Sequence, residues 1–266
     1  MIKKYCRNTI IQAGASINSS FNLCNGGRIV ALHDVPNAEI FRRKIEWLND
    51  NYNIVSLEDI LTGKNSKSQK NVAITFDDGY QNWLDNAVPV LEEFQVKAVF
   101  FTCSGMVGLN KSKSDKFIRS QLLRSQKLTS ISQSSLREIS NNNLFEIGGH
   151  TCNHINLGRT ANEDDIMKQI KIDKELLEKW TGKELRWFAY PFGGKESFND
   201  VVKDIVKRCG YASAFTILPN YVKKENIDLY EIGRDCLELD APVKLWKNCL
   251  DGGYDVFSKL KNKWFK

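Results

Sequence analysis

The chain has 266 residues, of which 42% are hydrophobic and 26% charged, so it is long and apolar enough to bury a sizeable core. Its net charge of +6 is modest and its basic residues are spread along the chain without a nucleic-acid-binding motif, which argues against a protein that binds DNA or RNA. No apolar run approaches the roughly 18 residues that a membrane-spanning helix needs.

The cysteines and the N-terminus both bear on the cellular compartment. Seven cysteines, an odd number, are scattered without a C-x-x-C pair, which favours free thiols over a disulfide framework or a thiolate zinc site. Residues 1–27 begin with basic residues like an export signal, but Gln12, Ser16 and Asn18 interrupt the apolar centre. We therefore expect an N-terminal extension on a protein that stays in the cytoplasm.

Short apolar runs rich in β-formers alternate with amphipathic stretches along most of the chain. The predicted strands are Arg28–His33, Asn53–Val55, Val72–Phe76, Lys97–Thr102, Leu144–Gly148, Leu185–Tyr190, Tyr211–Ile217 and Leu229–Gly233. Three of the intervening helices have recognisable residues at both ends, and they run from Ser56 to Gly63, from Asn162 to Gly182 and from Asp240 to Gly253. The polar stretch Gly108 to Ser135 predicts an insertion or a mobile loop.

This alternation predicts an α/β fold with a parallel sheet, either doubly wound or closed into a barrel. No glycine-rich nucleotide-binding loop follows an early strand, and polar candidate residues follow several different strands. Both features favour a barrel, because the carboxyl ends of its strands meet at one face. No stretch has the composition of a linker between domains, so residues 1–266 are predicted to form a single catalytic domain.

The stretch TFDDG places two carboxylates, Asp77 and Asp78, at the end of an apolar strand. Adjacent charges at the end of a buried element repel each other and lose hydration. A fold that keeps both therefore indicates a bound cation or a shared proton. Alone, the motif also fits a turn with an aspartate helix cap.

The three histidines of the chain, His33, His150 and His154, all follow predicted strands. If residues 150–154 form a helical turn, the i, i+4 spacing lets both imidazoles bind one divalent ion, with a carboxylate of TFDDG as the third ligand. Cys152 should then face away. Each histidine also has an ordinary interpretation, as a surface residue or a satisfied core residue, and only the combination favours a metal site.

The motifs TFDDG, GHTCNH and YPFGG, in this order and spacing, resemble those of the polysaccharide deacetylase family, and the likeness spans roughly residues 28 to 235. The resemblance implies an irregular (β/α) barrel of about seven strands, related to the TIM barrel. It also implies a metal-dependent hydrolase that removes N-acetyl groups from sugars. Matched by position, Asp77 is the catalytic base, and Asp78, His150 and His154 are the metal ligands.

The third motif and the general acid depart from the commonest pattern of that family. The usual arginine before the proline is absent, and Ala189 and Tyr190 stand there instead. No histidine follows His154. A branch that modifies surface polysaccharides is similar, since it has a Y-P-[FY]-G motif and takes the acid from the first strand, where this chain has His33.

Three further site residues, all in the YPFGG motif, are expected from the same resemblance. Phe192 matches the residue whose backbone N–H stabilises the oxyanion, and Gly193 shapes the turn that presents it. Tyr190, from the same motif, is assigned with them to the oxyanion and substrate site. Arg234 is our candidate for orienting Asp77, and an ordinary salt bridge explains that arginine equally well.

The predicted function is removal of an N-acetyl or other N-acyl group from an amino sugar of a surface polysaccharide, or from its nucleotide- or lipid-linked precursor. The alternatives are an N-deformylase acting on a lipid-linked amino sugar and a carbohydrate-binding barrel without activity. Zinc suits the ligand set best, and cobalt, nickel or iron would also be accepted. The basic aromatic tail, residues 252–266, is expected to pack as a terminal helix or to contact the inner membrane surface.

Overall fold

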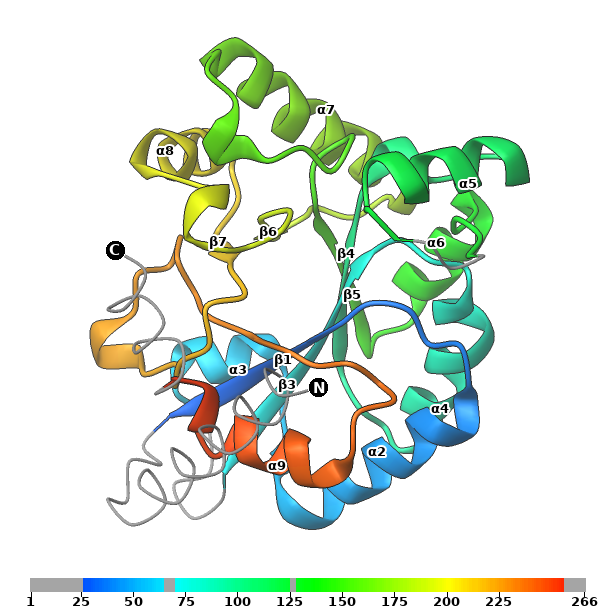
Figure 1. Ribbon diagram of the computed structural model, residues 1–266, viewed down its shortest axis with the longest axis vertical. Coiled ribbons are helices and arrows are strands. Elements are labelled where there is room, and N and C mark those ends of the chain that lie inside the picture. Colours follow the sequence, from blue (N-terminus) through cyan, green and yellow to red (C-terminus); the bar gives the residue numbers. More distant parts are fainter. Residues whose placement is uncertain (1–25, 65–69, 125–127, 256–266) are drawn as a thin grey trace, which may run out of the picture.

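A computed structural model describes residues 26–64, 70–124 and 128–255 (Figure 1). The strands are β1 (Gly27–Leu32), β2 (Asn53–Ile54), β3 (Asn71–Asp78), β4 (Ala98–Thr102), β5 (Phe145–Gly149), β6 (Trp187–Ala189), β7 (Ser213–Phe215) and β8 (Asp235–Cys236). The α-helices are α2 (Ala38–Asn51), α3 (Leu57–Thr62), α4 (Val88–Glu93), α5 (Lys111–Ser120), α6 (Gln133–Asn141), α7 (Glu163–Thr181), α8 (Asp200–Arg208) and α9 (Val243–Leu250). None of these helices is both long enough and apolar enough to cross a bilayer.

The strands form one parallel sheet in the order β7-β6-β5-β4-β3-β1-β8, with β2 beside β3. The sheet curls, and the stretch 232–236 spans from one edge to the other: Ile232 pairs with Phe215 of β7, and Asp235 pairs with Val30 of β1. The predicted barrel is thereby confirmed. The predicted strand Leu229–Gly233 is wrong, because its residues mostly form a turn and only Ile232 bridges to the sheet.

The registers of the central strands align their carboxyl ends. Leu32 lies opposite Phe76, Asp78 opposite Thr102, and Thr102 opposite Gly149. Residues that directly follow these strands therefore gather at one end of the barrel. This alignment brings together motifs that are about seventy residues apart in the sequence.

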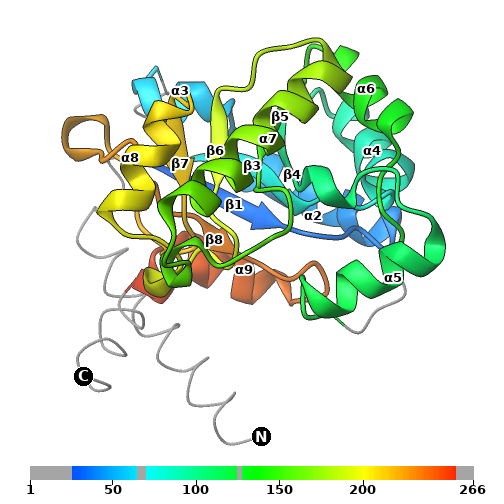
Figure 2. The same ribbon diagram turned by 90° about the horizontal axis from the view of Figure 1, so that it is seen from above.

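Two apolar layers hold the curled sheet. Side chains of β3 alternate between them, so Val72, Ile74 and Phe76 face the surrounding helices while Ala73 packs in the interior of the barrel. Helix α3 also contributes to the interior through Leu57, Ile60 and Leu61. Figure 2 shows the helices outside the sheet, with α7 and α8 side by side.

The predicted helix ends are mostly confirmed. The Ser56 side chain accepts a hydrogen bond from the Asp59 amide, and α3 ends at Gly63 with a left-handed φ of 68°. Helix α7 is capped by Asn162 and ends at Gly182 with φ 71°. The exception is α9, which has Pro242 as its first flanking residue and no side-chain cap, so Asp240 does not cap it.

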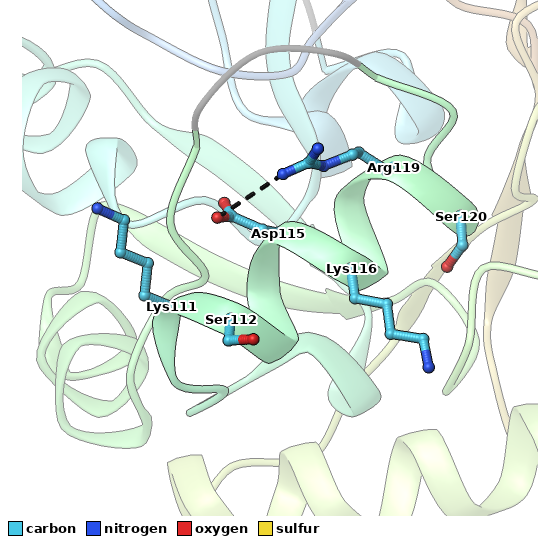
Figure 3. Close-up of a pocket in the computed structure, with 6 residues that line it drawn as sticks. All are labelled: Lys111, Ser112, Asp115, Lys116, Arg119 and Ser120. Atoms are coloured by element: carbon cyan, nitrogen blue, oxygen red, sulfur yellow. Dashed lines mark ion pairs between the residues drawn. The ribbon is translucent and has the colours of Figure 1, made fainter.

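The stretch Gly108 to Ser135, predicted as an insertion or a mobile loop, contains α5 and the start of α6, whereas residues 121–124 and 128–132 between them are not helical. The Asn110 side chain caps α5 by accepting from the Lys113 amide, and Ile118 of this helix is buried. Lysine and serine residues hide this short amphipathic pattern in the sequence. Figure 3 shows the polar face of α5, where Asp115 and Arg119 form an ion pair beside a shallow hollow.

Candidate active site and metal centre

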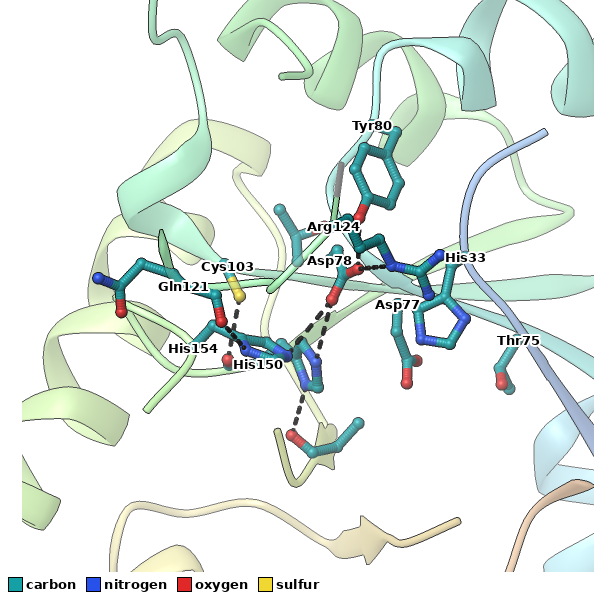
Figure 4. A network of polar contacts seen from close by, with 12 residues as sticks. His33, Thr75, Asp77, Asp78, Tyr80, Cys103, Gln121, Arg124, His150 and His154 are labelled. Atoms are coloured by element: carbon teal, nitrogen blue, oxygen red, sulfur yellow. Dashed lines mark hydrogen bonds and ion pairs between the residues drawn. The ribbon is translucent and has the colours of Figure 1, made fainter. Parts of the chain in front are cut away.

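Asp78, His150 and His154 converge at the carboxyl ends of β3 and β5 (Figure 4). Their ligand atoms lie within 4.8 Å of one another, and all three side chains are buried. Asp78 Oδ1 is 3.6 Å from His150 Nε2 and 3.5 Å from His154 Nε2. These separations are long for hydrogen bonds, but two ligands each about 2.1 Å from a tetrahedral ion lie about 3.4 Å apart. The residues therefore fit a shared divalent cation.

The Nδ1 atoms of His150 and His154 are each held by a backbone carbonyl. His150 Nδ1 donates to the Ala189 carbonyl at 2.7 Å, and His154 Nδ1 donates to the Gln121 carbonyl at 3.1 Å. Because a carbonyl can only accept, a proton resides on each Nδ1, and each Nε2 faces Asp78. This second layer of contacts is typical of histidines that bind metals.

Two of the three residues have protonation states that suit a metal site, whereas His150 differs: burial lowers the pKa of its imidazole, but Asp78 and Asp77 raise it further, so the net pKa is above the usual value. Burial lowers the pKa of His154 to about 4, although Asp78 opposes this effect, so the ring is neutral at neutral pH. Burial raises the pKa of the Asp78 carboxyl, but His150 and the other two histidines lower it further, and the pKa lies well below its usual range. The second carboxylate oxygen of Asp78 accepts a 2.7 Å hydrogen bond from the Tyr80 hydroxyl.

Residues 150–154 do not form the predicted helical turn. Thr151 and His154 have left-handed φ angles of 66° and 51°, which non-glycine residues adopt only when their surroundings hold them there. The Cys152 amide donates to the Gln169 carbonyl of α7, which helps to hold the loop. Ser104 Oγ lies 3.4 Å from Cys152 Sγ, and this thiol is not part of the cluster that could hold a metal, as the sequence predicted.

Asp77 faces the barrel interior and is held by Arg234. The guanidinium donates to both carboxylate oxygens at 2.7 Å, and it also donates to Thr75 Oγ1 and to the Thr216 carbonyl. Burial raises the pKa of the Asp77 carboxyl, but Arg234 more than offsets this and keeps the pKa below its usual range. Asp77 is therefore an ionised carboxylate next to the cluster but outside it. The structure thus brings Arg234 to Asp77.

His33 follows β1 and lies close enough to Asp77 and Asp78 to interact with both charges (Figure 4). Its carbonyl accepts a 2.6 Å hydrogen bond from Trp83 Nε1, which fixes the backbone at this point. Burial lowers the pKa of the His33 imidazole, Asp78 raises it, and the net pKa is below the usual value. The third histidine of the sequence is therefore at the same site.

The two aromatic residues of the YPFGG turn after β6, Tyr190 and Phe192, lie in different surroundings. Phe192 is 39% exposed, has a left-handed φ of 61°, and its ring centroid lies 4.6 Å from that of His154. Gly193 has φ 55°, and a Cβ there would lie 2.8 Å from the Ile217 nitrogen, so the turn requires glycine. Tyr190 is buried and its hydroxyl donates to the Tyr230 carbonyl, so the structure places it in the core and not at the cluster.

The sequence-based prediction did not include several residues that lie at the site. Arg124 comes from the non-helical stretch that follows α5, and its guanidinium lies 3.7 Å from Asp34 and 4.0 Å from Asp78. The Gln121 carbonyl comes from the same segment. Tyr80 could have been found, because it lies two residues after Asp78 in the motif itself.

Known proteins are similar to this chain in sequence and in fold. The family model described as polysaccharide deacetylase matches residues 64–214. The poly-beta-1,6-N-acetyl-D-glucosamine N-deacetylase of Staphylococcus aureus (strain MRSA252) is 26% identical over 219 residues, which cover 77% of this chain and 70% of the relative. The protein of the same name from Staphylococcus epidermidis is 26% identical over 233 residues, covering 85% of this chain and 75% of the relative.

Solved structures show the same fold. IcaB from Ammonifex degensii superposes with a TM-score of 0.68 at 19% identity, covering 87% of this chain and 97% of that one. The Streptococcus pyogenes deacetylase PplD in complex with acetate gives a TM-score of 0.65 at 20% identity, covering 84% and 97%. The predicted barrel and hydrolase class are thereby confirmed. Because the family model matches more than half of the sequence, the chain belongs to the polysaccharide deacetylase family.

Proposed function

We propose that the chain is a divalent-metal-dependent hydrolase that removes an N-acetyl group from an amino sugar of a surface polysaccharide or its precursor. The observation that carries the proposal is the cluster of Asp78 with His150 and His154, at 3.5 to 3.6 Å, beside an ionised Asp77. The staphylococcal relatives are named for poly-beta-1,6-N-acetyl-D-glucosamine, which supports an N-acetylglucosamine unit as the substrate.

Asp78, His150 and His154 would hold the metal ion. Zinc suits two imidazoles and one carboxylate, and cobalt, nickel or iron would also be accepted by this donor set. The bound ion would supply Lewis-acid activation of water and of the amide carbonyl.

The remaining residues divide the proton transfers of amide hydrolysis. Asp77 takes a proton from the attacking water. Arg234 keeps the Asp77 carboxylate ionised and fixes its orientation. The backbone N–H of Phe192 would donate to the oxyanion. His33 gives a proton to the sugar nitrogen as the C–N bond breaks, which yields a free amine and a carboxylate.

The cellular setting is proposed from the sequence alone. We propose that the reaction takes place in the cytoplasm, on a nucleotide- or lipid-linked precursor. Residues 1–25 and 256–266 lie outside the described part of the chain. The structure therefore does not bear on the predicted N-terminal extension or on membrane contact through the C-terminal tail.

Mass spectrometry of the acid released from N-acetylated sugar oligomers, sugar nucleotides and lipid-linked sugars tests the proposal. Acetate release is expected, whereas formate release would favour a deformylase. Asp77→Asn should abolish turnover while the protein still binds stoichiometric zinc. The control is Asp85→Asn, an exposed carboxylate a few residues along, which should keep full activity. A wild-type protein that takes up no divalent ion would favour a carbohydrate-binding barrel without activity.

A further inference from the structure

Asp173 of α7 is a buried carboxylate whose two oxygens bind two backbone amides. Oδ1 accepts from the Ser104 amide at 2.8 Å, and Oδ2 accepts from the His150 amide at 2.9 Å. Its side chain is fully buried, and it forms no ion pair with a lysine or arginine of the described residues. A buried charge is costly unless it is paired or hydrogen-bonded, and hydrogen bonds from the Ser104 side chain and from these two amides stabilise it.

The two amides belong to neighbouring strand ends. Thr102 of β4 pairs with Gly149 of β5, and beyond this point the ladder stops. Ser104 follows the first strand and His150 follows the second, so the carboxylate continues the connection where backbone pairing ends. Both N–H groups would otherwise be buried without partners, at a cost of about 1–3 kcal/mol each.

The surroundings of Gly149 show that this connection has little freedom to move. A Cβ at Gly149 would lie 2.1 Å from the Tyr211 hydroxyl oxygen and 3.0 Å from Asp173 Oδ2. The backbone immediately before His150 is therefore packed directly against the carboxylate. Movement of Asp173 would displace His150, whose Nδ1 is separately held by the Ala189 carbonyl.

We propose that Asp173 is a positioning residue that fixes the backbone of the metal ligand His150 by tying it to the end of β4. The inference rests on the proposed metal site of Asp78, His150 and His154. Asp173 does not touch the ligand atoms, so it acts through the placement of His150. Metal ligands that lose such support typically lose 10–100-fold in affinity.

The variant Asp173→Asn tests the inference. Asparagine keeps the shape but offers one acceptor oxygen, so its NH2 group faces one of the two amides. We expect zinc affinity, measured by competition with a chelator at a temperature where both proteins are folded, to fall 10–100-fold. In the zinc-free protein, hydrogen exchange at the Ser104 and His150 amides should become faster than in wild type.

The matched control is Asp251→Asn. Asp251 is also a buried carboxylate, but it lies at the end of α9 and pairs with Lys70 and Lys247. This variant should lose stability while its zinc affinity stays within about twofold of wild type, since the 10–100-fold loss is expected only of groups that support ligands.

Unchanged zinc affinity and unchanged amide exchange in Asp173→Asn would overturn the inference. Should that variant not fold, Asp173→Glu keeps the charge, moves the carboxylate by one methylene group and is expected to give the same losses. Fast exchange of the His150 amide in the wild type would overturn it without any variant. If the wild type binds no zinc at all, the proposed function fails, and this outcome is distinct from a wild type and a variant that bind equally well.

Discussion

Arg234 donates one hydrogen bond of 2.7 Å to each carboxylate oxygen of Asp77, and the two side chains are buried together. The planar guanidinium, with two N–H groups directed at the two oxygens, fixes the rotation of the Asp77 carboxylate and keeps it ionised. Arg234 lies in the stretch 232–236, which spans the two edges of the sheet, so the segment that closes the barrel also orients the proposed base.

Arg234→Lys should lower kcat by about 10–100-fold with a smaller change in KM. Lysine keeps the charge but cannot make both hydrogen bonds, and hydrogen bonds to charged groups contribute about 1.5–3 kcal/mol. Steady-state kinetics on the acetylated substrate measure the effect. The control is Arg186→Lys, an exposed arginine that donates to both oxygens of Glu58 and lies outside the site. Equal activity of the two variants would contradict an orienting role for Arg234.

His33→Gln should lower kcat by about 100- to 10,000-fold, because the leaving amine loses its proton donor. Its zinc content, measured by plasma emission spectroscopy, should equal that of the wild type, since His33 is not in the ligand cluster. A variant that turns over normally would exclude His33 as the acid. Loss of zinc would instead identify it as a ligand.

Zinc should stabilise the folded protein. At about 100 times its Kd, a ligand that binds only the folded state adds about 2.7 kcal/mol, which corresponds to a rise in Tm of about 5–10 °C for a chain of this size. His154→Ala should lose most of this rise, measured by thermal unfolding with zinc and with chelator. Cys152→Ser should keep it, because the Cys152 thiol faces Ser104. A rise lost in the serine variant would mean that the thiol is a ligand.

Asp251 should contribute to acid unfolding. Burial raises the pKa of its carboxyl, but Lys247 and Lys70 lower it further, so the folded pKa is below the ordinary value of 3.8. The ion pairs therefore stabilise the protein fully above about pH 5, and this contribution is lost as the pH falls below about 4. Because Lys70 and Lys247 are 37% and 58% exposed, we expect only about 1 kcal/mol.

Urea unfolding at pH 7 and at pH 3 measures this difference. The free energy of unfolding of Asp251→Asn should fall less between the two pH values than that of the wild type. An equal decrease in both proteins would show that other carboxylates account for the acid sensitivity.

The sequence predicted the barrel and the meeting of Asp77 and Asp78 with all three histidines. The physical reason is simple, because aligned parallel strands end at one face and each motif directly follows an apolar strand. The buried ion pair of Asp77 with Arg234 was also anticipated as one of two interpretations. What the sequence could indicate was therefore the position of residues along strands.

The geometry between strands was less predictable. The i, i+4 spacing of His150 and His154 indicated a helical turn, but left-handed φ angles at Thr151 and His154 bring the imidazoles together instead. Those angles depend on contacts with distant residues such as the Gln121 carbonyl. Arg124 was missed for a similar reason, since the polar composition of its segment conceals the helix that leads to the site.

The alternation of side chains along β3 explains how two like charges can be neighbours. Asp77 continues the inward face of Ala73 and Thr75, whereas the backbone of Asp78 turns with φ 93° and directs its carboxylate to the imidazoles. Deleting one residue between Asn71 and Phe76 would exchange these two directions. Such a shift would present the wrong carboxylate to Arg234, so the length of this strand should tolerate change less well than the identity of most residues in it.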